Sequence, residues 1–394
     1  MTNTEIIMRL LKFCFDGEKF ILELADERLS ELMTDAMAHQ IHPLIYDALQ
    51  HISDSDILKK YHSHMIATGV METKTYFEVQ KVLDALYEVN INAIAVKGAY
   101  LKTLYEVPEH RLMGDVDIVI SDDAEYAQAE NIFRSRGYDF VATYCNTTDF
   151  SKPNAVNFEV HRQLIFGEKR GYSVAGDTLN GYRRVFEEVK DGCILTVDPT
   201  THLLYLIDHM ASHFAAGGCG FRQLYDVAIM TRAKQSEIDW ERFWSQTSDL
   251  RLTSFIANIY KILQQYISLE AVPPHLDEHF ENDHSAQLLE TLYKSGVFGR
   301  KNKTAMYSNL IASGHTKGAY KGKGVFLNLL NTLFPLKLSE KRYVFAQKHP
   351  LLLPIAWIDR IFVFLRTRFH LSDIKNVDWK EARKKIRLIE ELEL

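Results

Sequence analysis

The chain is poor in cysteine, has no long apolar run and carries no excess of positive charge. Its four cysteines, spread over 394 residues, form no C-x-x-C pair, which argues against a zinc knuckle or a disulfide framework and favours reduced thiols. No uninterrupted apolar run reaches the ~20 residues that span a bilayer. Residues 1–20 contain charges within their apolar stretch and lack a signal-peptide cleavage pattern. We therefore expect a cytoplasmic protein without a transmembrane segment.

The charge balance also limits the partners. The formal net charge is −6 at pH 7, whereas non-specific binding to long nucleic acid depends on many Lys and Arg contacts to phosphate. We therefore expect no long nucleic acid as a partner. The stretch from Lys294 to Lys337 is locally basic, with eight Lys or Arg and no Asp or Glu. We interpret it as a solvated face, and a partner-binding surface is the alternative.

Composition and periodicity indicate the fold class. Hydrophobic residues make up 46% and charged residues 25% of the chain, as is typical of globular proteins. Apolar residues at helical spacing predict helices before residue 90 and after residue 198, and the segment between them alternates strands with helices. We therefore predict an α+β fold with a small mixed β-sheet, flanking helices and a mostly helical C-terminal lobe. The expected parts are a helical N-terminal segment (1–75), an α/β core (76–197) and a mostly helical C-terminal domain (198–394).

The elements of the core follow from these runs. The acidic residues after Ile120 favour a helix start, and Gly137 ends that helix near Arg136. A polar loop is expected at residues 147–154. The expected strands are residues 91–96, 115–120, 138–144 and 157–164.

A further apolar segment runs from Leu351 to Leu365. It is too short to span a bilayer and is broken by Asp359 and Arg360. We predict a core helix entered through Pro354, and an interfacial membrane helix is the alternative.

The second and fourth of the expected strands carry carboxylates. Asp115 and Asp117 share one face of DVDIVI, because successive side chains of a strand point to opposite faces. Asn157, Glu159 and His161 likewise share one face of NFEVHRQL. If these strands are neighbours, three carboxylates can bind magnesium, with manganese as the alternative ion. An edge strand with one solvated face is the simpler interpretation of a D-x-D pattern.

The geometry predicts two properties of these carboxylates. Closely spaced like charges repel, so Asp117→Asn is expected to leave the metal-free protein as stable or slightly more stable. Glu159, and not Glu168, is the expected third metal ligand, because Glu168 follows Gly167 in the turn-like segment GEKRG.

The first strand ends in Lys97 and Gly98. A glycine at a strand-to-helix turn lets backbone N–H groups approach a phosphate, and Lys97 would add a positive charge there. Lys97 is alternatively a structural partner of Asp115 or Asp117.

The segments VKGAYLKTLY, RLMGDVDIVI and NFEVHRQL together resemble the polymerase-β-type nucleotidyltransferase superfamily. More narrowly, they resemble its bacterial branch usually labelled uncharacterised nucleotidyltransferase, and the likeness continues through LLYLIDHMASHF, FRQLYDVAIM, SGVFG and RYVFAQKHPLLLPIAWIDR. The resemblance implies an NTP substrate, a nucleotide-binding turn at Gly98, and metal ligands at Asp115, Asp117 and Glu159. The sequence departs from the superfamily pattern at Gly98-Ala99, where Gly-Ser or Gly-Gly is usual, and in a longer link from Gly98 to Asp115.

Further polar residues match the branch around this core. Arg111 lies where the branch also has an arginine, and a guanidinium can bind phosphate through two hydrogen bonds. A surface pair with Glu106 or Glu109 is the alternative. The acceptor-side candidates are His161, His209, His213 and Asp226, with Arg222 as a weaker one. Zinc is not predicted at the two histidines four residues apart, because the H-E-x-x-H pattern is absent.

The sequence therefore predicts a magnesium-dependent nucleotidyltransferase. It would transfer a nucleoside monophosphate from an NTP to an unidentified acceptor hydroxyl, of a small molecule or sugar, and release pyrophosphate. A toxin-like enzyme that modifies protein or RNA is one alternative. A catalytically silent nucleotide-binding module is the other, although three converging acids are costly without a metal.

Overall fold

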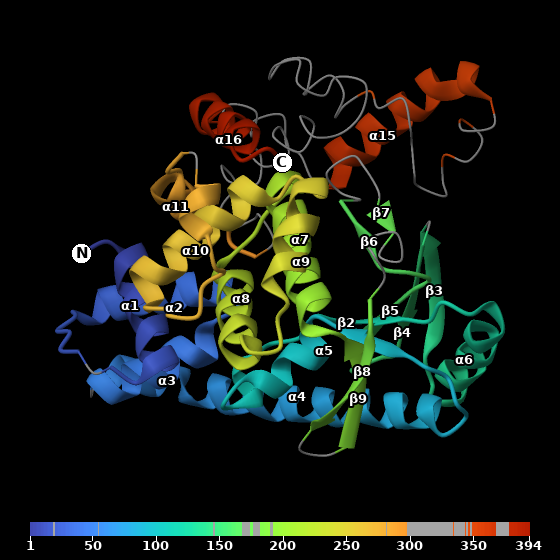
Figure 1. Cartoon of the computed structure of the whole chain (residues 1–394), viewed down its shortest axis with the longest axis horizontal. Coiled ribbons are helices and arrows are strands. Elements are labelled where there is room, and N and C mark those ends of the chain that lie inside the picture. The colour runs from blue at the N-terminus through green and yellow to red at the C-terminus, as the bar shows by residue number, and fades with distance from the viewer. Residues whose placement is uncertain are drawn as a thin grey trace.

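The computed structural model of the chain describes residues 1–18, 20–53, 55–144, 146–167, 174–175, 182–189, 192–280, 282–297, 334, 343, 346, 349–367 and 378–394 (Figure 1). The described α-helices are α1 (Asn3–Asp16), α2 (Asp26–Ala38), α3 (His42–Ile52), α4 (Asp56–Tyr87), α5 (Gly98–Leu101), α6 (Asp123–Ser135), α7 (Pro199–Ala216), α8 (Phe221–Lys234), α9 (Trp240–Asp249), α10 (Thr253–Ile267), α11 (Ser285–Ser295), α15 (Leu353–Thr367) and α16 (Trp379–Glu391). The described strands are β1 (Ile94–Val96), β2 (Asp115–Val119), β3 (Asp139–Tyr144), β4 (Thr147–Ser151), β5 (Asn157–His161), β6 (Ile165–Phe166), β7 (Val174–Ala175), β8 (Arg184–Val189) and β9 (Gly192–Val197).

The central sheet has five strands in the order β1-β2-β5-β4-β3. β2 runs parallel to β5, whereas the other three neighbouring pairs are antiparallel, so the predicted small mixed sheet is confirmed. The parallel pair is what matters for the site, because it places the second and fourth predicted strands side by side.

The prediction of a polar loop at residues 147–154 is wrong, because residues 147–151 form β4. This strand pairs with β3 on one side and β5 on the other. Thr148 and Phe150 are buried on one face, while Thr147, Asp149 and Ser151 are half-buried on the other. The alternation in TTDFS thus matters more than its polarity, since one buried face suffices to stabilise a strand.

Helix α4 runs along the lower side of Figure 1, from the N-terminal helices toward the sheet. The Ser55 hydroxyl caps it by accepting a hydrogen bond from the backbone N–H of Ile57. The predicted boundary between residues 75 and 76 falls inside this helix. The boundary between residues 197 and 198 lies between β9 and α7, where Asp198 caps α7. Buried apolar side chains from α1 through α11 and from α16 form one cluster, Ala356 of α15 belongs to a second one, and the division into three parts stays a prediction.

Residues 351–365 were predicted to form a core helix, and this prediction is wrong in one respect, because one side of the helix is exposed. A helix is present as α15, but Leu351 just before it and Ile355, Ile358 and Phe362 within it are exposed. Their spacing places them on one side of the helix, and only Ala356 is buried among the described side chains of α15. Within the described ranges, no helix combines the length and apolar character needed to cross a membrane.

Two predicted features lie largely outside the described residues. Lys294 is described and pairs with Glu290 and Glu381, but residues 298–333 and 335–337 of the basic stretch are not. Glu168 is likewise outside the described part of the chain.

Candidate active site

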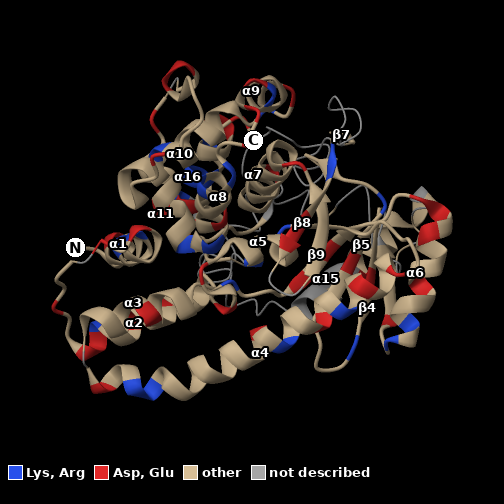
Figure 2. Ribbon diagram, turned by 60° about the horizontal axis from the view of Figure 1, so that its bottom comes forward, with Lys and Arg blue, Asp and Glu red and all other residues tan. Residues whose placement is uncertain are grey.

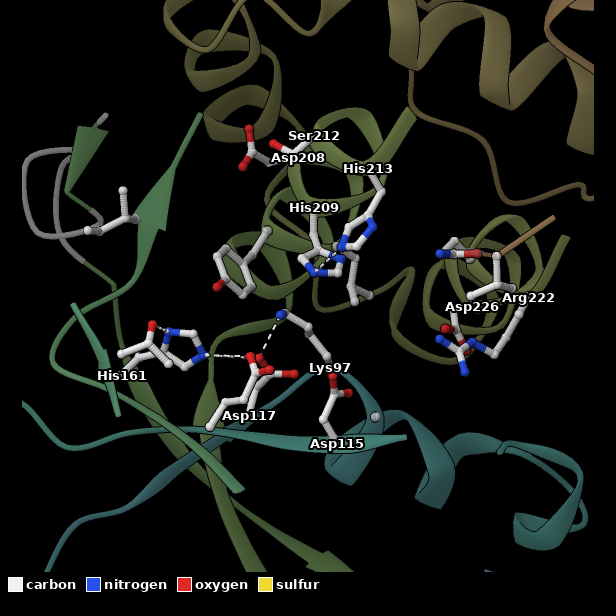
Figure 3. Close-up of a pocket in the computed structure, with 18 of the residues that line it drawn as sticks. Lys97, Asp115, Asp117, His161, Asp208, His209, Ser212, His213, Arg222 and Asp226 are labelled. Carbon is white, nitrogen blue, oxygen red and sulfur yellow. Dashed lines mark hydrogen bonds and ion pairs between the residues drawn. The ribbon is translucent and has the colours of Figure 1, made fainter. Parts of the chain in front are cut away.

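The carboxylate-bearing face of the sheet and helices α7 and α8 enclose a cleft of about 330 Å³ (Figure 3). Every residue that the sequence singles out as catalytic, nucleotide-binding or acceptor-side lines this cleft. The lining residues are Lys97, Gly98, Arg111, Asp115, Asp117, Asn146, Thr147, Glu159, His161, Ile165, Tyr205, Leu206, Asp208, His209, Ser212, His213, Arg222, Gln223, Asp226 and Val297.

Asp117 and Glu159 lie side by side in this cleft. Parallel pairing of β2 with β5 sets Asp117 opposite Glu159 and Asp115 opposite Asn157. The condition set from the sequence, that these two strands are neighbours, is therefore met. Asp117 is only 3% exposed, whereas Asp115 is exposed at the start of β2.

His161 completes a compact group with Asp117 and Glu159. One ligand atom from each of the three residues lies within 4.8 Å of the others. His161 was expected on the acceptor side, but its Nε2 lies 3.0 Å from Oδ1 of Asp117. Its Nδ1 lies 2.9 Å from the hydroxyl of Thr147 on β4. The imidazole therefore belongs with the carboxylates.

Lys97 is the cation closest to this group in Figure 3, and its Nζ donates to Oδ1 of Asp117 at 2.7 Å. Burial opposes the charge on Asp117, but Lys97 and His161 outweigh it and hold the pKa of Asp117 below its usual range. Burial also opposes the charge on Lys97, and Asp117 overcomes this to raise the pKa of the Lys97 ammonium. The structure thus shows Lys97 in the alternative role, as a partner of Asp117, and its contact with phosphate stays a prediction.

Two further acids share this face of the sheet. Burial, followed by the charges of Asp117 and Asp115, raises the pKa of Glu159 to about 6. Asp149 on β4 pairs in register with Glu159, and the acidic positions of β4 and β5 are red in Figure 2. Burial raises the pKa of Asp149, and the charge of Asp115 acts in the same direction. Sequence reasoning missed Asp149 because it assigned residues 147–154 to a loop.

Lys97 has an uncommon backbone conformation, with φ 53° and ψ −124°. A non-glycine residue there is strained by about 1–3 kcal/mol, and such strain persists only where neighbours hold it. The Lys97 backbone N–H donates to Nε2 of His202 at 3.0 Å. The Thr196 hydroxyl donates to the carbonyl of Ala95, so Nδ1 of His202 is the donor toward Thr196 at 3.3 Å. His202 is therefore neutral with a bare Nε2, and it anchors the strand end that presents Lys97.

This anchor predicts a specific acid sensitivity. His202 is fully buried, and burial lowers its pKa from 6.5 to about 3. Below pH 6.5 His202 is protonated in the unfolded chain but stays neutral in the folded chain. Its contribution to the free energy of unfolding is therefore fully present above pH 6.5 and is lost as the pH falls toward 3. From pH 7.5 to 5.5 this one group is expected to lower the free energy of unfolding by about 1.4 kcal/mol. In urea unfolding, the loss between these two pH values should be larger in the wild type than in His202→Gln by about 1.4 kcal/mol. An identical pH dependence in both proteins would contradict the assignment.

Gly98 follows directly, and its lack of a side chain is required by its neighbours. A Cβ at this position would lie 2.7 Å from Nη1 of Arg111 and 3.2 Å from Cγ of Met113. The guanidinium therefore packs against the backbone of the Gly98 turn.

Arg111 and Asp226 form a buried pair with two hydrogen bonds. Nε and Nη2 of Arg111 lie 3.2 and 2.9 Å from the two Asp226 oxygens, and Nη1 donates to the carbonyl of Leu112. Tyr105 also donates its hydroxyl to Asp226, at 2.8 Å. The alternative of a surface arginine paired with an acid in the link is thus wrong. Asp226, expected on the acceptor side, is instead engaged by Arg111 and Tyr105.

The link that carries Arg111 is held by a second buried pair. Nζ of Lys102 donates to Glu72 of α4 at 2.6 Å and to the carbonyl of Arg111 at 2.9 Å. Glu72 also accepts the backbone N–H of Met113 at 3.3 Å. This network fixes the chain between the Gly98 turn and β2.

Helix α7 provides the opposite wall of the cleft. Nε2 of His209 and Nε2 of His213 lie 3.1 Å apart, so one nitrogen is a donor and the other an acceptor. Asp208 accepts the backbone N–H of Gly167 at 3.0 Å. Figure 3 shows both imidazoles across the cleft from Asp115 and Asp117. The predicted pair of histidines thus faces the carboxylates.

The comparisons with known proteins bear on this site. A family profile described as uncharacterised nucleotidyltransferase matches residues 26–268. No curated protein matches the chain in sequence. The crystal structure of an antigenic nucleotidyltransferase-like protein from Paracoccidioides brasiliensis is similar over 51% of this chain and 94% of that chain, at 16% identity and a TM-score of 0.30. That likeness is too weak to support an inference. The family match, by contrast, covers more than half of the chain, including the sheet and helices α7 and α8, and the chain belongs to the uncharacterised nucleotidyltransferase family.

Proposed function

We propose that this protein is a divalent-metal-dependent nucleotidyltransferase of the polymerase-β type. It transfers a nucleoside monophosphate from an NTP to the hydroxyl of a small molecule or sugar and releases pyrophosphate. The observation that carries the proposal is the register of β2 and β5, which sets Asp117 beside Glu159 in the cleft. Membership of the nucleotidyltransferase family supports the reaction class.

The donor set fits a hard divalent cation. Asp117 and Glu159 supply carboxylate oxygens within 4.8 Å of each other and of a His161 nitrogen. Magnesium prefers such oxygens, and manganese also accepts imidazole. Asp115 lines the same cleft and is the further carboxylate we assign to the metal. A bound Mg²⁺ would neutralise charge on the phosphates and lower the pKa of the acceptor hydroxyl.

The other residues bind and orient the substrates. Lys97 and the Gly98 turn face the phosphates, and Arg111 holds the turn in place because Asp226 already engages its guanidinium. His209 and His213, which hydrogen-bond to each other through their Nε2 atoms, form the wall of the cleft that faces the acceptor molecule. The acceptor oxygen bonds to the α-phosphorus, the bond from that phosphorus to the bridging oxygen breaks, and pyrophosphate leaves. The hydroxyl proton passes to water in the same step.

Label transfer tests this proposal. Each NTP, labelled at either the α- or the γ-phosphate, is incubated with protein, Mg²⁺ and fractionated cell extract. The α-label should move to an acceptor while pyrophosphate appears, and EDTA should stop both. Transfer of the γ-label, or nucleotide binding without any transfer, would contradict the proposal. The size class of the labelled product separates a small acceptor from protein or RNA.

A further inference from the structure

Arg222, at the start of α8, is a cation without a carboxylate partner among the described residues. Its Nη1 donates to Oε1 of Gln40 and to the carbonyl of Leu112, both of which are uncharged. Its Nε is buried and makes no hydrogen bond within the described ranges. A partly buried positive charge with only neutral acceptors is costly, and a bound anion would offset that cost.

The charge of the neighbouring acid, Asp226, favours the Arg222 cation, but its oxygens already accept hydrogen bonds from other side chains. Both oxygens of Asp226 are engaged by Arg111, and one of them also by Tyr105. Figure 3 shows the Arg222 side chain beside Asp226. Burial and the neighbouring charge of Arg111 lower the pKa of Arg222 to about 10, which still leaves it charged at neutral pH.

The position of Arg222 indicates which anion it meets. Arg222 and Arg111 donate to the same carbonyl, that of Leu112, at 3.2 and 2.8 Å. The Arg111 atom that donates to this carbonyl is Nη1, and the same atom packs against Gly98, where it would clash with an added Cβ. The Arg111 guanidinium thus lies between Arg222 and the Gly98 turn, which places Arg222 at the phosphate end of the proposed nucleotide site.

We propose that Arg222, and not Arg111, binds the β- and γ-phosphates of the NTP through the part of its guanidinium that lines the cleft. This assignment rests on the proposed function for the identity of the anion. The phosphate chain then lies between Lys97 on one side and Arg222 on the other. A phosphate group on the acceptor has the same chemistry, and the experiment separates the two sources.

The test measures binding of pyrophosphate, a non-hydrolysable NTP analogue and the matching NMP, each with Mg²⁺, by calorimetry. Arg222→Gln should weaken pyrophosphate and analogue binding about 10- to 100-fold, the range for losing charge-assisted hydrogen bonds. NMP binding should stay within about twofold, since an NMP lacks the β- and γ-phosphates. Arg134→Gln removes an exposed charge from α6, where it pairs with Glu130, and should change none of these affinities.

Unchanged pyrophosphate and analogue affinity in Arg222→Gln would overturn the assignment, and an anionic acceptor would then be the remaining source. If that variant does not fold, wild-type crystals grown with pyrophosphate and Mg²⁺ decide the matter. Phosphate oxygens within hydrogen-bond distance of Arg222 support the proposal, and pyrophosphate bound elsewhere refutes it. Arg222-dependent pyrophosphate binding without label transfer would refute the proposed function alone. Transfer with an unchanged KM for NTP in Arg222→Gln would refute the Arg222 assignment alone.

Discussion

Asp117→Asn is expected to lower nucleotidyl transfer about a thousandfold or more. Asp117 is only 3% exposed and contacts both Lys97 and His161. Losing a metal ligand costs several kcal/mol of transition-state stabilisation, and each 1.36 kcal/mol is tenfold in rate. Asp139→Asn, at an exposed position on β3 of the same sheet, is the matched control and should keep full activity. Steady-state assays with the labelled NTP measure both variants, and near-normal turnover in Asp117→Asn would contradict the assignment.

The same substitution is also expected to lower stability, contrary to the expectation from the sequence. Repulsion among carboxylates predicted an unchanged or more stable variant. In the structure Asp117 is instead flanked by the Lys97 ammonium at 2.7 Å and by His161 at 3.0 Å. Removing its charge leaves the largely buried Lys97 without its closest counter-charge, and breaking a buried ion pair costs about 3–5 kcal/mol. Urea unfolding in EDTA should therefore show a less stable Asp117→Asn protein.

Lys102→Met is expected to lower the free energy of unfolding by about 3–5 kcal/mol, because it strands the charge of Glu72 in the interior. The Lys102 side chain is fully buried and that of Glu72 is 8% exposed. Lys59→Met is the matched control, since it breaks an exposed pair with Asp56 and should cost no more than about 1 kcal/mol. Urea unfolding compares the two variants.

A double variant shows how much of the stability lost in Lys102→Met is due to the unpaired charge of Glu72. Adding Glu72→Leu to Lys102→Met removes the stranded carboxylate, so part of the lost stability should return. Full recovery is not expected, because the backbone groups of Arg111 and Met113 lose their partners. A Lys102→Met protein as stable as Lys59→Met would show that the buried pair does not hold the link.

Local pattern was enough to predict the strands of the site. DVDIVI and NFEVHRQL alternate polar and apolar residues, and period-two alternation fixes which side chains share a face. The pattern within each strand could not predict that β2 and β5 pair in parallel and set Asp117 beside Glu159, because strand pairing and register depend on the tertiary fold. Only the resemblance to a family indicated that the carboxylates of these two strands belong to one metal site.

What sequence reasoning missed depends on partners far apart in the chain. Arg111 and Asp226 are separated by 115 positions, and Lys97 and His202 by 105. No spacing rule connects such residues, so the sequence alone leaves Arg111 as either a phosphate ligand or a surface residue. In the structure Arg111 is paired with Asp226, whereas Nε of Arg222 makes no hydrogen bond among the described residues. This difference makes Arg222, and not Arg111, the candidate for binding phosphate.

Anomalous diffraction from crystals grown with Mn²⁺ and a non-hydrolysable NTP analogue tests the central claim most directly. The account predicts a manganese peak bonded to carboxylate oxygens of both Asp117 and Glu159 at about 2.0–2.3 Å, with the analogue's phosphates on the same ion. A peak away from β2 and β5, or bound analogue with no metal between these two side chains, would contradict it.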